Sequence, residues 1–446
     1  MSTARASVFA VISLALVACG GGDDSTAFGE GDGRGPSANR ESRGGGGDDD
    51  RNDGDGRDGE TTATGPVPTG ACVIKADVRK STTWSKSACP DGYLVKFETR
   101  VTGAGVALTI EPGTVVKHQG SGMLIVEDGA AIRAVGSPAE KIRFTSLDGA
   151  PASWRGLRIT SDSVDDQIAH AVIEHAGSSS QTRAALTLAS DGAQSGRLAL
   201  ADTEIVDNAR LGLEMYGDAK LTSFDRVTVK RNEEGAIHVQ APLVPQLQGA
   251  GNAIGVAFVE AYSLAKVDAD AKWPSLAPAV YRIVGQNGKG GDILQVQAHL
   301  EIEAGTVIEL APGSGVLVAG GASGLRAVGT ADETIVFRGV GGSGWEGITF
   351  GESTWTENRL EHVEVRSALK APSWGHYGTG NTSVKKAGIL VGYNFSTPVQ
   401  LTVKDFVVAG PNNAPADVAV RSGTTLVQQG SVSGTGAGGT LVVESF

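Results

Sequence analysis

Short apolar stretches dominate the chain after residue 70, where they alternate with polar residues until Gly, Asn or Asp interrupts them. Alternation over about four to six residues is typical of a β-strand with one buried face, and the interrupting residues favour tight turns. No long stretch has the periodicity of about 3.6 residues that marks an amphipathic helix. The pattern therefore predicts an all-β fold of short strands rather than a doubly wound α/β sheet, with a β-sandwich as the alternative.

The spacing of these stretches indicates how the strands return. Two of them, 205–213 and 227–237, carry Asn208 and Asn232 at matching positions, 24 residues apart. A coil of a parallel β-helix needs three short strands and three turns, which fits this length, and each coil buries its apolar side chains only against its neighbours. We therefore expect a parallel β-helix, which is a solenoid.

The same region is also duplicated on a longer scale. The phrase LTIEPGTVV from Leu108 returns as LEIEAGTVI from Leu300, and IRAVGS from Ile132 returns as LRAVGT from Leu325. Further pairs at nearly the same offset are Trp84 and Trp273, Tyr93 and Tyr281, Phe144 and Phe337, Trp154 and Trp345, and His170 and His362. The matches predict two β-helix repeat copies, 71–254 and 255–446, in which Trp154 and Trp345 pack the same coil corner.

The repeated phrases, IEPGTV followed by AVG[ST], [KT]I.F and W.G[LI], resemble those of bacterial surface lipoproteins with right-handed parallel β-helix repeats. The resemblance covers residues 71–446 and implies a right-handed solenoid of the pectate-lyase-like superfamily fold, located at the cell surface. The second copy departs from the phrase by carrying Ala304 where the first has Pro112. Because many activities share this fold, the resemblance implies an architecture and no particular chemistry.

The N-terminus has the layout of an export signal. Arg5 precedes an apolar run, 6–18, that is too short to span a bilayer as a helix. The run ends LVACG, which resembles the bacterial lipobox and implies a signal peptide of residues 1–18, cleavage before Cys19, and acylation of Cys19 by palmitate-type chains. Several acyl chains anchor a protein stably. Gly20 after the cysteine favours the outer membrane, and we expect the anchored protein to be exposed at the cell surface. An ordinary cleaved signal is the alternative.

Residues 19–70 follow the lipidated cysteine as a predicted disordered linker. Positions 20–70 contain 16 Gly, 12 acidic and 5 basic residues and a single aromatic, Phe28. Such a segment buries too little apolar surface to offset its chain entropy. The whole chain of 446 residues carries a net charge of -12, so it lacks the clustered cations that nucleic acid requires, and no nucleic-acid partner is expected.

Two cysteines remain once Cys19 is lipidated. Cys72 and Cys89 lie in an exported chain, where thiols of this kind oxidise, and neither belongs to a CxxC pair or has a neighbouring histidine. We predict that they form a disulfide near the N-terminal edge of the solenoid.

An insertion distinguishes the second copy. The segment from Val365 to Ile389 is 11 residues longer than its counterpart from Ile173 to Leu186. Turn insertions in repeat proteins commonly build the binding face, and exposed aromatic rings bind by stacking. Four residues in or near the insertion form the candidate ligand platform: Trp355, Trp374, His376 and Tyr377. The alternative is a small hydrophobic cluster that closes the loop.

No catalytic residue, metal ligand set or cofactor motif is predicted. The nearest approach to a lyase site is Asp162, Asp165 and Asp166 with Arg155 and Arg158, which a solvated turn explains equally well. The histidines lack metal spacing, and no nucleotide loop or nucleophile elbow occurs.

The sequence thus predicts a lipid-anchored envelope protein that acts as a non-enzymatic scaffold for binding or adhesion. Its partners would be the membrane, through the lipid, and a polysaccharide or another surface protein. A polysaccharide lyase or hydrolase of the β-helix type and a purely architectural envelope protein are the alternatives.

Overall fold

The computed structural model describes the chain from residue 69 onward in eight segments, which are 69–178, 183–188, 196–261, 265–286, 290–368, 387–392, 398–410 and 416–445. These segments belong to one compact unit, Gly59–Phe446. The signal peptide, Cys19 and the linker up to residue 68 lie outside the described residues. Within the described segments, no helix is long and apolar enough to cross a membrane.

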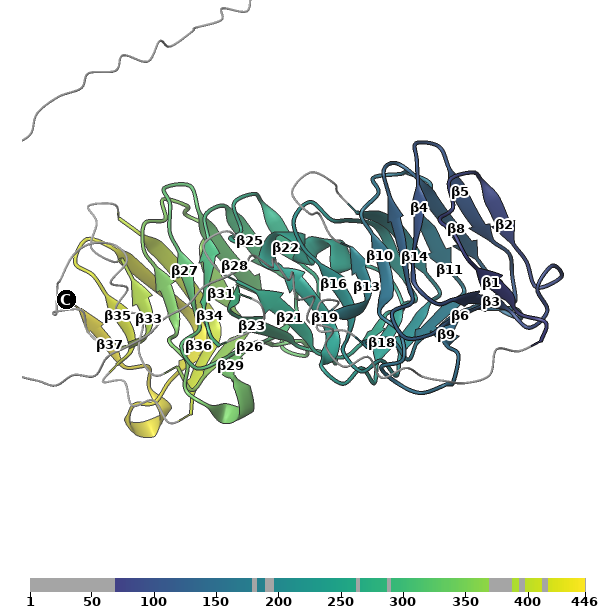
Figure 1. Cartoon of the computed structure of the whole chain (residues 1–446). Coiled ribbons are helices and arrows are strands. Elements are labelled where there is room, and N and C mark those ends of the chain that lie inside the picture. Colours follow the sequence, from purple (N-terminus) through teal and green to yellow (C-terminus); the bar gives the residue numbers. More distant parts are fainter. Residues whose placement is uncertain are drawn as a thin grey trace, which may run out of the picture. The chain divides into compact units, whose positions relative to one another are not determined.

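Parallel β-sheet makes up nearly all of the described structure (Figure 1). In the first half, strands fall into three sheets, each named here after its first strand. The β1 sheet contains β1 (Cys72–Ile74), β3 (Tyr93–Val95), β6 (Val115–His118), β9 (Ile142–Ser146), β12 (Ala171–Glu174), β15 (Glu204–Val206), β18 (Thr228–Lys230) and β20 (Ala253–Ile254). The β2 sheet contains β2 (Thr82–Trp84), β5 (Ala107–Ile110), β8 (Ala131–Val135), β11 (Gln167–Ala169), β14 (Arg197–Ala201) and β17 (Lys220–Asp225).

The β4 sheet passes through both halves. It contains β4 (Glu98–Thr102), β7 (Met123–Glu127), β10 (Gly156–Ile159), β13 (Ala184–Leu188), β16 (Leu211–Met215), β19 (Gly235–Gln240), β21 (Ala257–Glu260), β23 (Tyr281–Val284), β26 (Val307–Leu310), β29 (Ile335–Gly339) and β32 (Val363–Arg366). Across the junction, His238 on β19 pairs with Phe258 on β21, which pairs with Arg282 on β23. One sheet therefore runs past residue 254, where the sequence places the boundary between the copies.

Two further sheets complete the second half. The β22 sheet contains β22 (Ala271–Trp273), β25 (His299–Ile302), β28 (Gly324–Val328), β31 (Arg359–Glu361), β34 (Gln400–Ala409) and β36 (Thr425–Ser433). The β24 sheet contains β24 (Ile293–Val296), β27 (Gly315–Val318), β30 (Ile348–Phe350), β33 (Ala387–Val391), β35 (Ala416–Val420) and β37 (Val443–Ser445). The long strand β34 also pairs with β32 through Val407, Val408 and Ala409.

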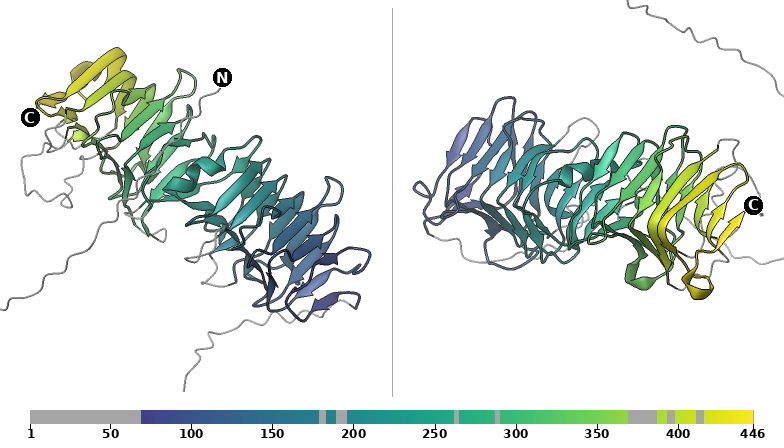
Figure 2. Two further views of the ribbon diagram at one scale, coloured as in Figure 1. Left: turned by 90° about the horizontal axis from the view of Figure 1, so that it is seen from above. Right: turned by 180° about the vertical axis from the view of Figure 1, so that it is seen from behind.

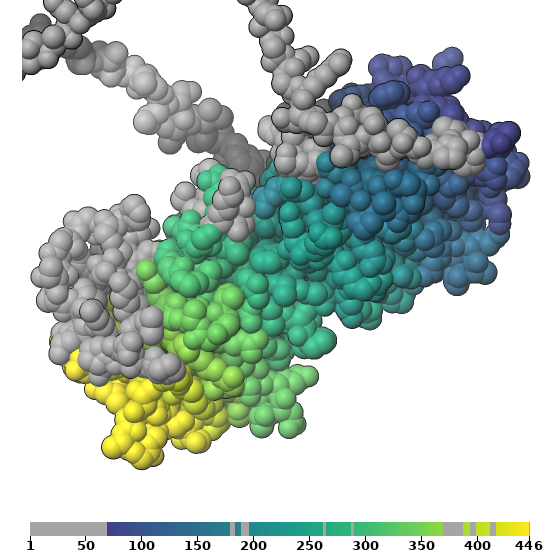
Figure 3. Space-filling view, turned by 60° about the horizontal axis from the view of Figure 1, so that its bottom comes forward, coloured from purple at the N-terminus to yellow at the C-terminus, as the bar shows by residue number. Residues whose placement is uncertain are grey.

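The only regular elements besides strands in the described segments are short 3-10 helices: η1 (Ala241–Leu247), η3 (Val340–Gly342) and η5 (Ala437–Gly439). Within each sheet the strands follow one another in chain order, so the colours advance from purple to yellow along the described part (Figure 2). The same order is visible on the molecular surface (Figure 3). The all-β prediction is confirmed, and this parallel arrangement is compatible with a parallel β-helix.

The core consists of apolar side chains stacked from strand to strand. In the β1 sheet, five register partners form one such stack, and each is 0% exposed: Val116, Phe144, Ile173, Ile205 and Val229. Burying each of these side chains stabilises the fold by about 1.5–3 kcal/mol relative to leaving it exposed. Because residues along a strand alternate between the two faces of the sheet, the residues next to these five on each strand point outward.

The two asparagines that set the predicted coil length lie at one corner of this stack. Asn208 Nδ2 donates to Asn232 Oδ1 at 2.8 Å, and Asn208 Oδ1 accepts from the Ala176 backbone N–H at 2.9 Å. The amide ladder therefore satisfies backbone groups where the chain leaves the sheet, which explains why asparagine recurs at this spacing.

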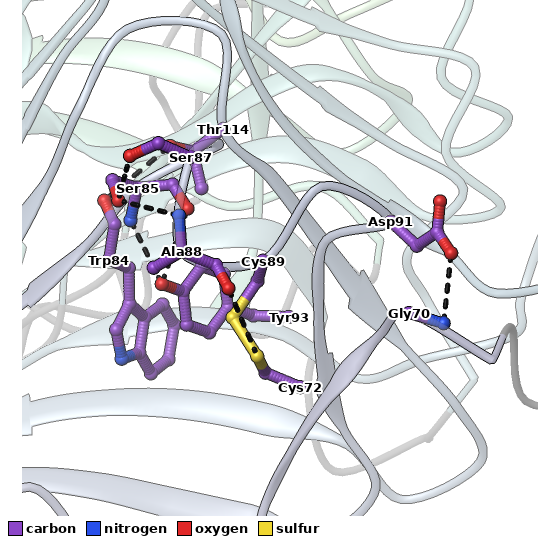
Figure 4. The surroundings of a disulfide bond; sticks show 10 residues. All are labelled: Gly70, Cys72, Trp84, Ser85, Ser87, Ala88, Cys89, Asp91, Tyr93 and Thr114. Carbon is purple, nitrogen blue, oxygen red and sulfur yellow. Dashed lines mark hydrogen bonds between the residues drawn. A yellow bond between two sulfur atoms is a disulfide. The ribbon is translucent and has the colours of Figure 1, made fainter.

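Cys72 and Cys89, which the sequence predicts as a pair, form a disulfide with their Cα atoms 5.7 Å apart (Figure 4). The bond joins β1 to the loop before β3. Beside it, the rings of Trp84 and Tyr93 stack with centroids 4.8 Å apart, and the Ser85 backbone N–H donates to the Tyr93 hydroxyl at 2.9 Å. A cross-link that closes a loop of this size stabilises the fold by about 3 kcal/mol in the chain-entropy account.

A candidate ligand-binding face on the second half

Of the four platform residues that the sequence predicts, the structure describes one. Trp374, His376 and Tyr377 lie outside the described residues. Trp355 lies in the turn between β30 and β31, and its side chain is half-buried. The candidate site is therefore built here from Trp355 and its neighbours on the β22 sheet.

The indole of Trp355 lies against the outward side of this sheet. Its rings stack on the imidazole of His299, with centroids 4.5 Å apart and an interplanar angle of 30°. A Cβ at Gly324 would lie only 1.8 Å from Cε3 of Trp355, so the six-membered ring packs against this glycine and leaves no room for a side chain there. His299 and Gly324 are register partners on β25 and β28. The indole therefore packs against both residues of the sheet, and its side chain remains partly exposed.

Asp270 fixes the orientation of His299. Its Oδ1 lies 3.0 Å from His299 Nδ1 and accepts from the His299 backbone N–H at 3.1 Å. These two contacts, the backbone bond first, hold the pKa of the Asp270 carboxyl below its ordinary value. The carboxylate is thus ionised at neutral pH and holds the imidazole in the plane on which the indole stacks.

A charged row runs next to the indole on the same face. Four register partners on successive strands form this row: Lys272 on β22, Glu301 on β25, Arg326 on β28 and Arg359 on β31. Their neighbours along the strands, Leu300, Leu325 and Leu360, are 0% exposed and point into the core, so the charged residues point outward.

Ion pairs link this row to carboxylates. Arg326 Nη1 lies 3.3 Å from Glu301 Oε1, and Arg359 Nε lies 2.6 Å from Glu361 Oε2. The side chains of Arg326 and Arg359 are 41% and 29% exposed, which leaves both guanidinium groups within reach of a ligand.

The first half lacks both features at the matching positions. Where the second half has His299, Gly324 and Trp355, the aligned residues of the first half are Ala107, Ala131 and Ser163. The row that corresponds to Lys272, Glu301, Arg326 and Arg359 reads Thr83, Thr109, Arg133 and Gln167, again in cross-strand register. The aromatic ring and the charged row are therefore additions to one copy of a shared framework.

The charged residues around the acidic turn of the first half have separate partners. Asp166 is 2% exposed, and its Oδ1 accepts from the Ile132 backbone N–H at 2.7 Å. Loss of solvation raises the pKa of this carboxyl to about 7. Asp165 pairs with Arg133, and Arg155 pairs with Glu98 at 3.3 Å, so these charges do not converge on a common point.

His170 and His362 occupy equivalent corners, both with φ of 47°. Each faces an aspartate: His170 faces Asp202, in the turn between β14 and β15, at 3.9 Å, and His362 faces Asp405, within β34, at 3.7 Å. The group of Glu361, His362 and Asp405 is compact enough for a cation. However, Glu361 Oε1 lies 2.6 Å from Lys404 Nζ and Oε2 pairs with Arg359, so both oxygens already have cationic partners. We therefore assign no metal to this group.

One polar row was not foreseen from the sequence. On the outward side of the β4 sheet, Thr187, Glu214 and His238 are register partners and are only 5%, 5% and 3% exposed. Arg183 Nη1 and His238 Nδ1 each lie 3.5 Å from Glu214 Oε1. Strand alternation predicts that these residues point outward, but it carries no signal that an outward row is buried.

Comparison of the chain with protein-family models, with curated proteins and with solved structures gave no match.

Proposed function

We propose that this protein is a lipid-anchored component of the bacterial cell surface that binds glycans through one face of a right-handed, internally duplicated parallel β-helix. Two observations support the architecture: strands return in parallel register along the described chain, and the two halves repeat contacts at aligned positions. For example, Trp154 Nε1 donates to Glu174 O at 2.9 Å, and Trp345 Nε1 donates to Arg366 O at 2.7 Å.

The observation that carries the binding proposal is the indole of Trp355. The indole packs against the sheet and remains partly exposed. The C–H face of a sugar ring stacks well on an exposed indole surface because both are apolar. The supporting contacts, His299 below the ring and Asp270 behind the imidazole, hold the indole in place before a ligand arrives. A pre-positioned ring loses little conformational entropy on binding.

Glycan binding can be tested by affinity electrophoresis or column retention of the full chain, in detergent, on a panel of neutral and acidic polysaccharides. We expect Trp355→Ala to weaken binding by about thirtyfold, which corresponds to about 2 kcal/mol for a central aromatic contact. Ser163→Ala, at the matching position of the first half, is the control and should bind as wild type. Unchanged binding by a folded Trp355→Ala protein would contradict the proposal, and release of cleavage products from the retained polymer would identify an enzyme instead.

The anchor rests on the lipobox-like LVACG segment and on the Gly/Asp-rich linker that follows it. We expect Cys19→Ala to move the protein from the membrane fraction to the soluble fraction, because the variant has no thiol to acylate. Fractionation with labelled fatty acid measures both location and acylation, and Ser25→Ala in the linker serves as the control. Retention of the unacylated variant in the membrane would show that another element holds the protein there.

A further inference from the structure

We infer that the ligand bound at the Trp355 face is an anionic glycan, with Arg326 and Arg359 binding its acidic group. This inference rests on the proposed function and adds the chemical class of the ligand. The geometry that points to it is the juxtaposition of two outward arginines and a partly exposed indole on the same face of the β22 sheet.

Arg326 and Arg359 are direct cross-strand partners on β28 and β31. Neighbouring strands lie about 4.8 Å apart, and like charges placed directly opposite one another destabilise a sheet. Each arginine has a carboxylate at its flank, Glu301 for Arg326 and Glu361 for Arg359, and among the described residues no single carboxylate pairs with both guanidinium groups. An anionic group bound between the guanidinium groups would relieve the repulsion.

The chemistry of the two side chains suits an oxyanion. A guanidinium group has five N–H donors in a planar fork, which is more than one ion pair consumes, and the fork matches the oxygens of a carboxylate or a sulfate. The carboxylates nearby are already engaged. Glu361 accepts from Lys404 and Arg359, and these bonds hold its pKa below the ordinary value, with the Lys404 contact contributing most. The acids therefore fix the arginines in position.

Arg326 lies on the same face as the ring and close to it along β28. Arg326 follows Gly324 by two residues on the same face of β28, which places their Cα atoms about 6.6 Å apart along the strand. Since the indole packs against Gly324, a sugar ring stacked on Trp355 brings a substituent of its own or of the next sugar to Arg326.

The first half provides the internal contrast. Its matching pair is Arg133 and Gln167, so one arginine is present without the second and without an aromatic ring. Arg133 pairs with Asp165 from the adjoining turn, and the residue that aligns with Asp165 in the second half is Glu357. The double arginine and the indole thus occur together in one copy and are both missing at the aligned positions of the other.

The test compares binding of the full chain to three polymers: a polyuronate, the same polymer after reduction of its carboxyl groups, and a sulfated polysaccharide. We expect wild type to bind at least one charged polymer about tenfold more tightly than the reduced one, since hydrogen bonds to ionised groups are the stronger ones. Arg326→Gln combined with Arg359→Gln should abolish this difference, and added salt should reduce it. Arg133→Gln is the matched control and should leave it intact.

The outcomes separate the two proposals. Equal affinity of wild type for the charged and the reduced polymers would overturn the anionic assignment, and so would a preference for the charged polymer that the double variant retains. In either case, binding that still depends on Trp355 would leave the glycan-binding proposal in place. Preference for the sulfated polymer alone would support the inference and identify the group as sulfate. No binding of any polymer by the folded chain would overturn both proposals. Arg326→Gln alone provides the same comparison if the double variant does not fold, which thermal denaturation reveals.

Discussion

Replacing Trp154 with alanine is expected to lower the free energy of unfolding by about 4 kcal/mol, the range for large buried aromatic residues. The indole is 0% exposed, and its N–H donates to Glu174 O at 2.9 Å. Its ring stacks on the imidazole of His118 with the two ring centroids 3.9 Å apart. Truncation would leave a cavity, an unpartnered carbonyl and an imidazole without its stacking partner. Each of these adds to the loss of apolar burial.

The measurement is equilibrium denaturation followed by circular dichroism and by calorimetry, since stacked-coil proteins can unfold in more than one step. Trp154→Phe keeps most of the apolar volume but loses the hydrogen bond, so it should cost about 1 kcal/mol from that bond and a smaller cavity term. Val164→Ala, at a side chain that is 77% exposed, is the control for a neutral substitution. A Trp154→Ala protein as stable as this control would refute a packing role for the indole.

The framework around these residues was predictable because it depends on local periodicity. Spacing of Asn208 and Asn232 gives the coil length, and the alternation of Leu108, Thr109 and Ile110 gives the inward face, which the structure confirms with exposures of 0% and 1% for the two apolar residues. Register partners on neighbouring parallel strands lie beside one another, so inward residues of the same strand position pack together. Trp154 and Trp345 occupy one aligned position in each half, and both are buried, at 0% and 1% exposed.

The candidate binding face was only partly predictable, because it depends on how a turn folds back on a sheet. Alternation places His299 and Gly324 on an outward face, but they precede Trp355 by 56 and 31 residues in the sequence. That the indole packs against Gly324 follows from the path of the turn between β30 and β31, which no periodicity specifies. The available signal was a comparison of the two copies, where the three residues replace Ala107, Ala131 and Ser163 together.

The burial of Asp166 was missed for a related reason, since a run of aspartates is usually a solvated turn. In the structure, Asp166 and Asn358 occupy the same place and accept from aligned backbone N–H groups, those of Ile132 at 2.7 Å and Leu325 at 3.0 Å. Asn358 also donates from Nδ2 to Ser353 Oγ and to Trp355 O, both at 2.7 Å. Asp166 Oδ2 is buried and has no hydrogen-bond partner among the described residues. The slot therefore suits an amide better than a carboxylate.

Asp166→Asn should consequently stabilise the protein at alkaline pH. Desolvation raises the folded-state pKa of Asp166 to about 7 from an ordinary value of 3.8, so the folded protein holds this proton more tightly than the unfolded chain does. The stability that the protonated group contributes is present below pH ~4, declines as the pH rises, and is lost above pH ~7. The amide does not titrate, so the gain should be near zero at pH ~4 and about 3–4 kcal/mol at pH ~8.

Urea denaturation of wild type and Asp166→Asn across this pH range measures the effect, with Asp218→Asn at an exposed turn as the control for loss of one carboxylate. The reciprocal change, Asn358→Asp, should introduce the same decline in stability into the second half, because it places a carboxyl group next to the Leu325 N–H and removes the Nδ2 donor. If the stabilities of wild type and Asp166→Asn fell in parallel between pH ~4 and pH ~8, Asp166 would have to be ionised in the folded state throughout. Such a result would require a partner for Asp166 Oδ2. If the stabilities of wild type and Asp166→Asn instead diverge as the pH rises, a protonated Asp166 holds this turn, whereas the amide of Asn358 holds the equivalent turn of the second half.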